Sequence, residues 1–176
     1  MIKKLILIMV PVMFVGCASN VGSRSDMTVH KRENYTKQIT DIIIGIKKDD
    51  LPIEFSAPLA SNLKSLLSQR GITADVRTTS ALDINPISQA EIMKHTYSMF
   101  CAKTHGLLTY SGALIELTLN CKLIENNSDM VVMLADIVIK KGWGFGFAQN
   151  EAENANQEIL TKLEETGLIS KLNSSR

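Results

Sequence analysis

Two alternating segments joined by a turn constrain the fold of this chain more than any other feature. Apolar and polar side chains alternate over residues 115–123, and the alternation resumes over Val131–Lys140. Between them, residues 125–129 (ENNSD) have the composition of a turn. A period of two is typical of strands with one buried and one solvent-facing side. In the first strand the buried side takes Ile115, Leu117, Leu119, Cys121 and Leu123, and the polar side takes Glu116, Thr118, Asn120 and Lys122.

The turn also predicts a register for this hairpin. Symmetry about Asn127 places Cys121 opposite Met133 and Thr118 opposite Asp136. With that pairing the apolar sides of both strands meet, and Asp136 falls on the polar side. We therefore expect an antiparallel pair with one face in the core.

The residues before the hairpin predict a strand, a helix and a second strand. The nearly unbroken apolar run over residues 39–46 (ITDIIIGI) favours a strand buried on both faces. A helix should begin at Ser56, contain Pro58 in its first turn and end at Gly71. A short strand follows over residues 72–78. One side of the helix is apolar: Leu59, Leu63, Leu66 and Leu67.

Two more helices complete the predicted order. The first runs from Asn85 to His105 and is followed by a short strand over residues 107–111. The last runs from Ala148 to Thr166 and ends at Gly167. The order β-α-β-α-β-β-β-α predicts an α/β (α+β) fold, with a mixed sheet of about five strands and three helices. The inward side of the helix that ends at His105 would carry Ala90, Met93, Tyr97 and Cys101.

The first 16 residues predict a signal peptide. Lys3 and Lys4 precede an apolar run, residues 5–15, that is too short to span a bilayer, which takes about 20 residues. The run ends in FVGC, which resembles the lipobox of bacterial lipoproteins. That resemblance implies a diacylglycerol on the sulfur of Cys17 and a further acyl chain, such as palmitate, on its amine. The alternative is an ordinary secretory signal that contains a cysteine.

The residue after the cysteine predicts a location. By the sorting rule of this lipoprotein class, Ala18 implies the outer membrane, with the folded part in the periplasm. Residues 17–37 are polar and predict a flexible tether between the signal peptide 1–16 and the folded domain. That domain is expected over residues 38–170, with a tail at 171–176.

Two cysteines remain once Cys17 carries lipid. Export would place Cys101 and Cys121 where disulfides form and persist, so a bridge between them is the first expectation. A metal site or a thiol-dependent enzyme built on His95, Cys101 and His105 is the alternative. Their spacing converges poorly on a helix, and Cys101 and His105 alone would share a face.

Three aromatic residues alternate with glycines in residues 142–147 (GWGFGF). The glycine spacing differs from the G-x-G-x-x-G of dinucleotide-binding turns. In an extended chain Trp143, Phe145 and Phe147 point to one side. They could pack under the last helix as core or form a partner-binding surface.

Most of the stretch over residues 39–169 resembles a family of periplasmic α/β domains. The family includes the N-terminal domain of TolB, the penicillin-binding-protein activator lipoproteins and the curli secretion lipoprotein. The resemblance lies in the helix ending at Gly71, in HGLLTYSG followed by ELTLNCKLIENN, and in ANQEILTKLEETGLI at the end. It implies a non-catalytic domain that binds or assembles. From the residues themselves we expect no cofactor and no metal.

The charge distribution limits the classes of molecule that this chain can bind. The net charge is +1 and no basic stripe is present, which argues against nucleic acid. We expect a lipid-anchored binding, assembly or regulatory module of a cell-envelope complex, with an envelope protein as its partner. A homo-oligomeric component of a secretion or surface-structure apparatus is a further alternative.

Overall fold

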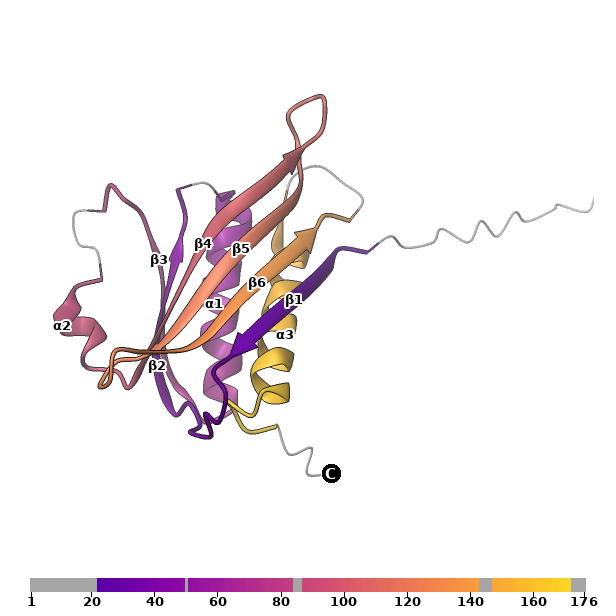
Figure 1. Cartoon of the computed structure of the whole chain (residues 1–176). Helices are drawn as coiled ribbons and strands as arrows, with labels where there is room; N and C mark the ends of the chain where they lie inside the picture. The colour runs from indigo at the N-terminus through magenta and orange to yellow at the C-terminus, as the bar shows by residue number, and fades with distance from the viewer. Residues whose placement is uncertain (1–21, 50, 84–86, 143–146, 172–176) are drawn as a thin grey trace, which may run out of the picture.

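The computed structural model describes residues 22–49, 51–83, 87–142 and 147–171. Two layers form an α+β fold, in which two long helices pack against one face of a mixed sheet (Figure 1). This confirms the predicted fold class, with six strands where the sequence predicted about five. The elements are β1 (Arg24–Lys31), β2 (Asp41–Lys47), α1 (Ile53–Gln69), β3 (Thr73–Thr79), α2 (Gln89–Ile92), β4 (Tyr97–Leu108), β5 (Leu114–Glu125), β6 (Met130–Lys140) and α3 (Gln149–Glu165).

The sheet has the order β1-β6-β5-β4-β2-β3. Strand β2 lies between β3 and β4 and is parallel to both. The other pairs, β4 with β5, β5 with β6 and β6 with β1, are antiparallel. The parallel half therefore comes from the β-α-β part of the chain and the antiparallel half from the hairpin.

Strand β1 is the sixth strand, and it lies in the stretch predicted to be a tether. It pairs with β6 along its whole length, with Met27 opposite Ile137. Met27 is 4% exposed and belongs to the core. The tether prediction is therefore wrong for residues 24–31. Strand β1 carries few apolar residues, and its partner β6 is about a hundred residues away in the sequence, so local pattern gave no sign of it.

The inward side predicted for the first long helix is confirmed at three of its four leucines, and Leu66 is half-buried. Leu59, Leu63 and Leu67 of α1 are buried, as are four residues of α3: Ala152, Ala155, Ile159 and Leu163. The glycines after each helix have positive φ, +73° at Gly71 and +71° at Gly167, as a left-handed helix end requires. Helix α1 begins at Ile53 rather than at Ser56, which is buried within its first turns.

The helix predicted over residues 85–105 is wrong. In the described part of this stretch, only the four residues of α2 are helical, and β4 begins at Tyr97. Strand β4 is central, bonded to β2 on one side and to β5 on the other. Every second side chain at the start of β4 points into the core: Tyr97, Met99 and Cys101. This strand periodicity overrides the helical spacing that the sequence suggested. Of the strand predicted over residues 107–111, Leu107 and Leu108 form the end of β4, and residues 109–111 lie in the turn before β5.

The β5–β6 hairpin forms as predicted, with a different register. Cys121 lies opposite Ala135 rather than Met133, and Thr118 lies opposite Val138 rather than Asp136. A bulge between Leu123 and Ile124 accompanies the turn. From Leu123 and Met133 away from the turn, the shift is two residues, which is one full strand period, so those side chains keep their predicted faces. Between the bulge and the turn the shift is one residue, and Val132 is buried where the alternation predicted Val131.

An amide is buried without partners on α3. Asn156 is 0% exposed, and neither its Nδ2 nor its Oδ1 has a hydrogen-bond partner among the described residues. Its neighbours on the helix, Ala155 and Leu160, are buried in the apolar core. Burying an amide without hydrogen bonds costs free energy that an apolar side chain of similar size would not lose.

We therefore expect Asn156→Leu to raise the free energy of unfolding by about 1–2 kcal/mol, measured by urea denaturation. Gln157→Leu, at an exposed position one residue further along α3, is the control and should change the value by less than about 0.5 kcal/mol. A loss of stability in the Asn156 variant would show that the amide has a role in the fold.

Candidate functional site

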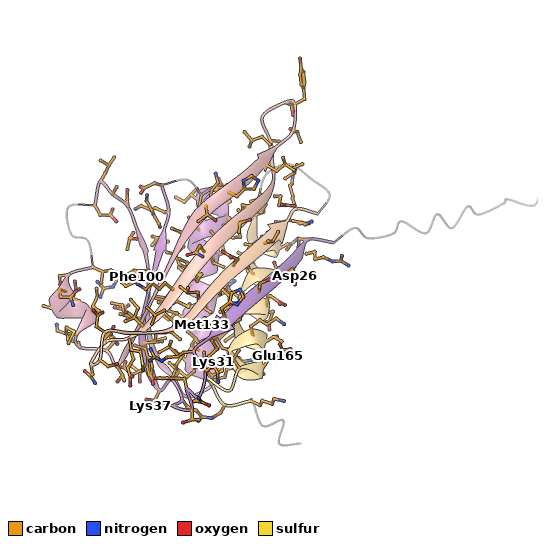
Figure 2. All side chains as sticks on the ribbon, in the orientation of Figure 1. Asp26, Lys31, Lys37, Phe100, Met133 and Glu165 are labelled. Carbon is orange, nitrogen blue, oxygen red and sulfur yellow. A yellow bond between two sulfur atoms is a disulfide. The ribbon has the colours of Figure 1, made fainter. Side chains whose placement is uncertain are left out.

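One face of the sheet carries no long helix in the described part of the chain, and the short α2 lies against it only beside Phe100. Helices α1 and α3 cover the opposite face (Figure 1). Alternate residues of β1, β6, β5 and β4 point to the open side, and Figure 2 labels Asp26 and Phe100 on two of these strands. We call this surface the open face. Its residues include Asp26, Thr28, His30, Leu134, Asp136, Val138, Thr118, Asn120, Lys122, Phe100, Ala102 and His105.

Apolar and charged side chains are interspersed on the open face. Leu134 is 44% exposed and is paired across the strands with His30 and Lys122. Asn120 Nδ2 donates to Asp136 Oδ1 at 2.9 Å, which orients both polar groups. Such a mixture is ordinary for the interface of a non-obligate complex, which is about as apolar as other protein surface.

The open face is hollowed beside Phe100. A cavity of about 450 Å³ lies at the carboxyl ends of β2 and β3, the parallel strands. A Cβ on Gly45 would lie 2.8 Å from Cδ1 of Phe100, so the glycine makes room for the ring. An apolar wall with a few polar groups at its edge is the usual form of a small-molecule site. The lining includes Gly45, Lys47, Thr79, Phe100, Ala102 and Asn120.

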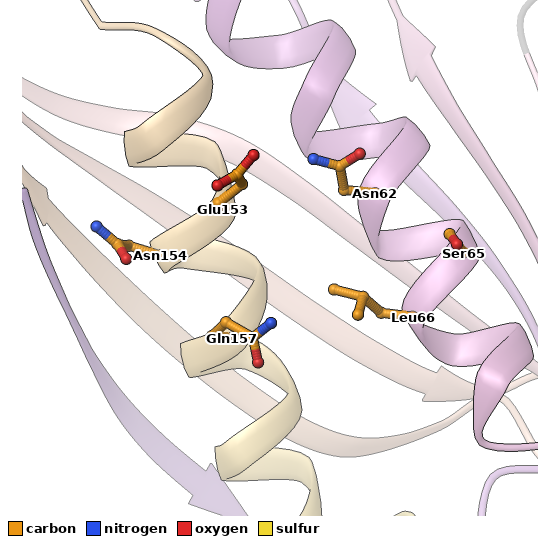
Figure 3. Close-up of a pocket in the computed structure, with 6 residues that line it drawn as sticks. All are labelled: Asn62, Ser65, Leu66, Glu153, Asn154 and Gln157. Carbon is orange, nitrogen blue, oxygen red and sulfur yellow. The ribbon is translucent and has the colours of Figure 1, made fainter.

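A second cavity, of about 360 Å³, lies between α1 and α3 on the other side of the molecule. Figure 3 shows Leu66 pointing from α1 towards α3 and Gln157 pointing from α3 towards α1. Asn154 Nδ2 donates to the backbone oxygen of Ser23 at 3.0 Å, so this amide holds the start of the described chain against α3. The other lining residues are Asn62, Ser65 and Glu153.

The predicted disulfide is confirmed. Cys101 and Cys121 lie directly opposite each other on β4 and β5, and their sulfur atoms are bonded. The residues are 4% and 0% exposed. The expected place of Cys101, on a helix packed against the sheet, is wrong, because the bridge joins two neighbouring strands.

The residues of the alternative metal or thiol site do not come together. The sulfur of Cys101 is bonded to Cys121, and His105 lies on the open face opposite Thr118. His95 Nδ1 is 2.8 Å from Asp41 Oδ1, and the other oxygen of Asp41 accepts from the Thr96 amide at 3.0 Å. Within the described ranges, no three His, Cys, Asp or Glu residues are grouped so that they could hold a metal ion.

Of the three aromatic candidates, Phe147 belongs to the core. It is 2% exposed, and its ring meets Phe55 of α1 edge-on, with 5.7 Å between centroids. A role in partner binding is therefore wrong for Phe147. Trp143 and Phe145 lie outside the described residues.

The perturbed carboxylates take part in local structural contacts. Lys37 Nζ lies 2.6 Å from Oε1 of buried Glu125, and its hydrogen bond lowers the pKa of that carboxyl group. Glu91 has a pKa lowered to about 2 by the Ser88 amide, by Arg77 and by the Ser88 hydroxyl. Ser88 and Glu91 form a capping box at the start of α2, which the S-x-x-E spacing in the sequence could have revealed.

Two tyrosine hydroxyl groups form a buried hydrogen bond that the sequence did not predict. The hydroxyl groups of Tyr35 and Tyr97 are 2.7 Å apart, and burial, followed by this hydrogen bond, raises the pKa of Tyr35. The pair joins the segment after β1 to the start of β4. None of these groups stands in one of the two larger cavities, so we assign them to the fold.

In the part of the chain that the structure describes, each helix is too short or too polar to cross a bilayer.

Comparisons with known proteins give distant likenesses in fold. No family model matches the sequence, and neither does any curated protein. Among solved structures, a PelC dodecamer from Paraburkholderia phytofirmans is 16% identical with a TM-score of 0.47, over 84% of this chain and 99% of that one. Lipoprotein GNA1162 from Neisseria meningitidis is 10% identical with a TM-score of 0.47, over 72% and 99%. TolB from Acinetobacter baumannii is 11% identical with a TM-score of 0.34, over 84% and 32%. At such overlaps, nothing about the activity of this chain follows from them.

Proposed function

We propose that this chain is a lipid-anchored protein of the bacterial cell envelope that acts by binding, without catalysis. Acyl chains on Cys17 hold it at the outer membrane, and the domain lies in the periplasm. The observation that carries the binding role is the open face. Four neighbouring strands present apolar and charged side chains on one side, while α1 and α3 cover the other. An envelope protein is the partner that this mixed surface suits.

The buried disulfide supports the proposed compartment. Cys101 and Cys121 are bonded inside the core, and such bridges form and persist in oxidising compartments such as the periplasm. The FVGC sequence before the domain supports export through the lipoprotein route. A diacylated or triacylated anchor is stable, because each buried CH₂ contributes about 0.8 kcal/mol.

The state of the reactive side chains supports binding rather than catalysis. Cys101 has no thiol, and His95 is held by Asp41 at the start of β2. His105 lies on the open face of β4, opposite a threonine and apart from both. Anchoring raises the effective concentration of the domain near its partner, so moderate affinity is sufficient.

Site-specific photo-crosslinking in living cells tests the binding role. A photoreactive amino acid at Thr118, in the open face, should give a discrete crosslinked species. The same amino acid at Ser68, exposed on α1, should not. Leu134→Asp should reduce the Thr118 crosslink at least about tenfold, because a buried unpaired carboxylate opposes association. Ile53→Asp, at another exposed apolar position away from the open face, is the matched control and should leave it unchanged.

Labelling with palmitate tests the anchor separately. The native chain should incorporate label, and Cys17→Ala should not. Equal crosslinking from Thr118 and Ser68 would contradict the binding role. Label retained by Cys17→Ala would contradict the anchor.

A further inference from the structure

One end of the sheet gathers the hairpin tip and the start of the described chain. In the register, Arg24 lies opposite Lys140, Lys140 lies opposite Glu116, and Glu116 lies opposite Leu107. This row crosses β1, β6, β5 and β4 in turn. The chain therefore enters the domain at the same end of the sheet as the β4–β5 turn (Figure 1).

The β4–β5 hairpin projects beyond its neighbour β2 at this end. The pairing of β4 with β2 stops at Cys101, and β4 continues to Leu108. Figure 1 shows the two strands extending as an arm above the rest of the sheet. The tip is ordered: Thr109 N donates to Ala113 O at 2.8 Å, and Gly112 turns the chain with a φ of +82°. We call residues 107–113 the arm tip.

The arm tip is strongly apolar and exposed. Leu107 is 48% exposed, Leu108 is 58% exposed and Tyr110 is fully exposed. Seven large apolar side chains are exposed in the described part of the chain, and three of them lie within residues 107–110. Scattered exposed apolar residues are ordinary, but a cluster on a projecting turn marks a contact.

The length of chain before β1 points to the occupant. Cys17 is seven residues before Arg24, and seven extended residues span at most about 25 Å. With acyl chains on Cys17, the bilayer surface must lie within that distance of the end of the sheet that carries the arm tip. We propose that the arm tip inserts into the interfacial layer of this bilayer, as a second contact beside the lipid anchor. The inference rests on the proposed anchor at Cys17.

The chemistry of the arm tip suits a lipid surface better than a protein. Tyr110 combines an apolar ring with a hydroxyl group, the combination that is enriched at the headgroup level of membranes. Leu107 and Leu108 supply apolar surface for the acyl boundary beneath it. A turn of seven residues is also too small for a stable protein interface, which buries roughly 800 Å² on each partner.

A fluorescent probe at the arm tip of the full lipidated chain tests the inference. The disulfide occupies Cys101 and Cys121, and Cys17 carries the lipid, so Ser111→Cys adds the one reactive thiol for an environment-sensitive dye. Met93→Cys is the matched control, because Met93 is 49% exposed and precedes β4 at the opposite end of that strand. Each protein is incorporated into phosphatidylethanolamine–phosphatidylglycerol vesicles with and without doxyl-labelled lipid, and recovered by flotation.

We expect doxyl lipid to quench the Ser111 probe by about half or more and to leave the Met93 probe unchanged. Adding Leu107→Ser, Leu108→Ser and Tyr110→Ser to the Ser111→Cys variant should at least halve that quenching, while the protein still floats through its anchor. Equal quenching of both probes in floated protein would overturn the inference and leave the anchor standing. A blue shift that grows with protein concentration without quenching would also overturn it, because it would place a second copy at the tip. Failure of the native chain to float would remove the anchor and this inference with it.

Discussion

Phe147→Ala is expected to lower the free energy of unfolding by about 3–5 kcal/mol. Phe147 is 2% exposed and precedes α3, and its ring packs edge-on against Phe55, which is 0% exposed. Removing the ring leaves a cavity between the start of α3 and α1. Close-packed neighbours relax only partly around such a cavity, so little of it is filled again.

Urea denaturation of the native chain and of Phe147→Ala measures this difference in the free energy of unfolding. Tyr110→Ala is the matched control: it removes an aromatic ring that is fully exposed and should change stability by less than about 0.5 kcal/mol. A double-mutant cycle with Phe55→Ala should return a coupling of about 0.5–1.5 kcal/mol for the ring pair. A loss below about 1 kcal/mol for Phe147→Ala would contradict its place in the core.

The sequence predicted those parts of the fold in which a periodic pattern and its end signals agree. Helix α1 has an apolar stripe and ends at Gly71, and α3 ends in the same way at Gly167. The β5–β6 hairpin has alternation on both sides of a turn-forming segment. Its register was still two residues off: the pair beside the turn, Glu125 with Met130, is already shifted by one residue, and the bulge at Leu123 and Ile124 adds the second. Composition marks neither shift.

The failures have a common physical origin in distant contacts. Strand β1 is stabilised by pairing with β6, and β4 by lying between β2 and β5. Neither partner is visible in a local window, so residues 24–31 resembled a tether and residues 97–105 the end of a helix. Pairing of β4 with β2 and with β5 buries Tyr97 and Met99 in the middle of the sheet, a position that only a strand can occupy.

The candidate site was less predictable than the fold. The open face is a property of the arrangement of helices over the sheet, and no motif encodes it. The cysteine count led to the correct pair, because Cys101 and Cys121 were the two left after Cys17. The pattern of alternating aromatics in residues 142–147 suggested a surface, yet Phe147 is core.

Reducing the disulfide is expected to lower the free energy of unfolding by about 3 kcal/mol. The bridge closes a loop of about 20 residues that contains the whole upper part of β4 and β5. In the reduced chain the unfolded state regains that loop entropy, while the strand pairing in the folded state stays the same. Urea denaturation with and without a thiol reductant measures the difference.

The double variant Cys101→Ala/Cys121→Ala is the control, because a thiol reductant should leave its transition unchanged. Equal midpoints for the oxidised and reduced native chain would contradict the expectation.

The bridge joins β4 to β5 at the point where β4 leaves β2 and the arm begins. Beyond that point the two strands support both the arm tip and one side of the open face. Loss of the bridge should therefore loosen the arm before it unfolds the helices, and hydrogen exchange should rise first at residues 102–118.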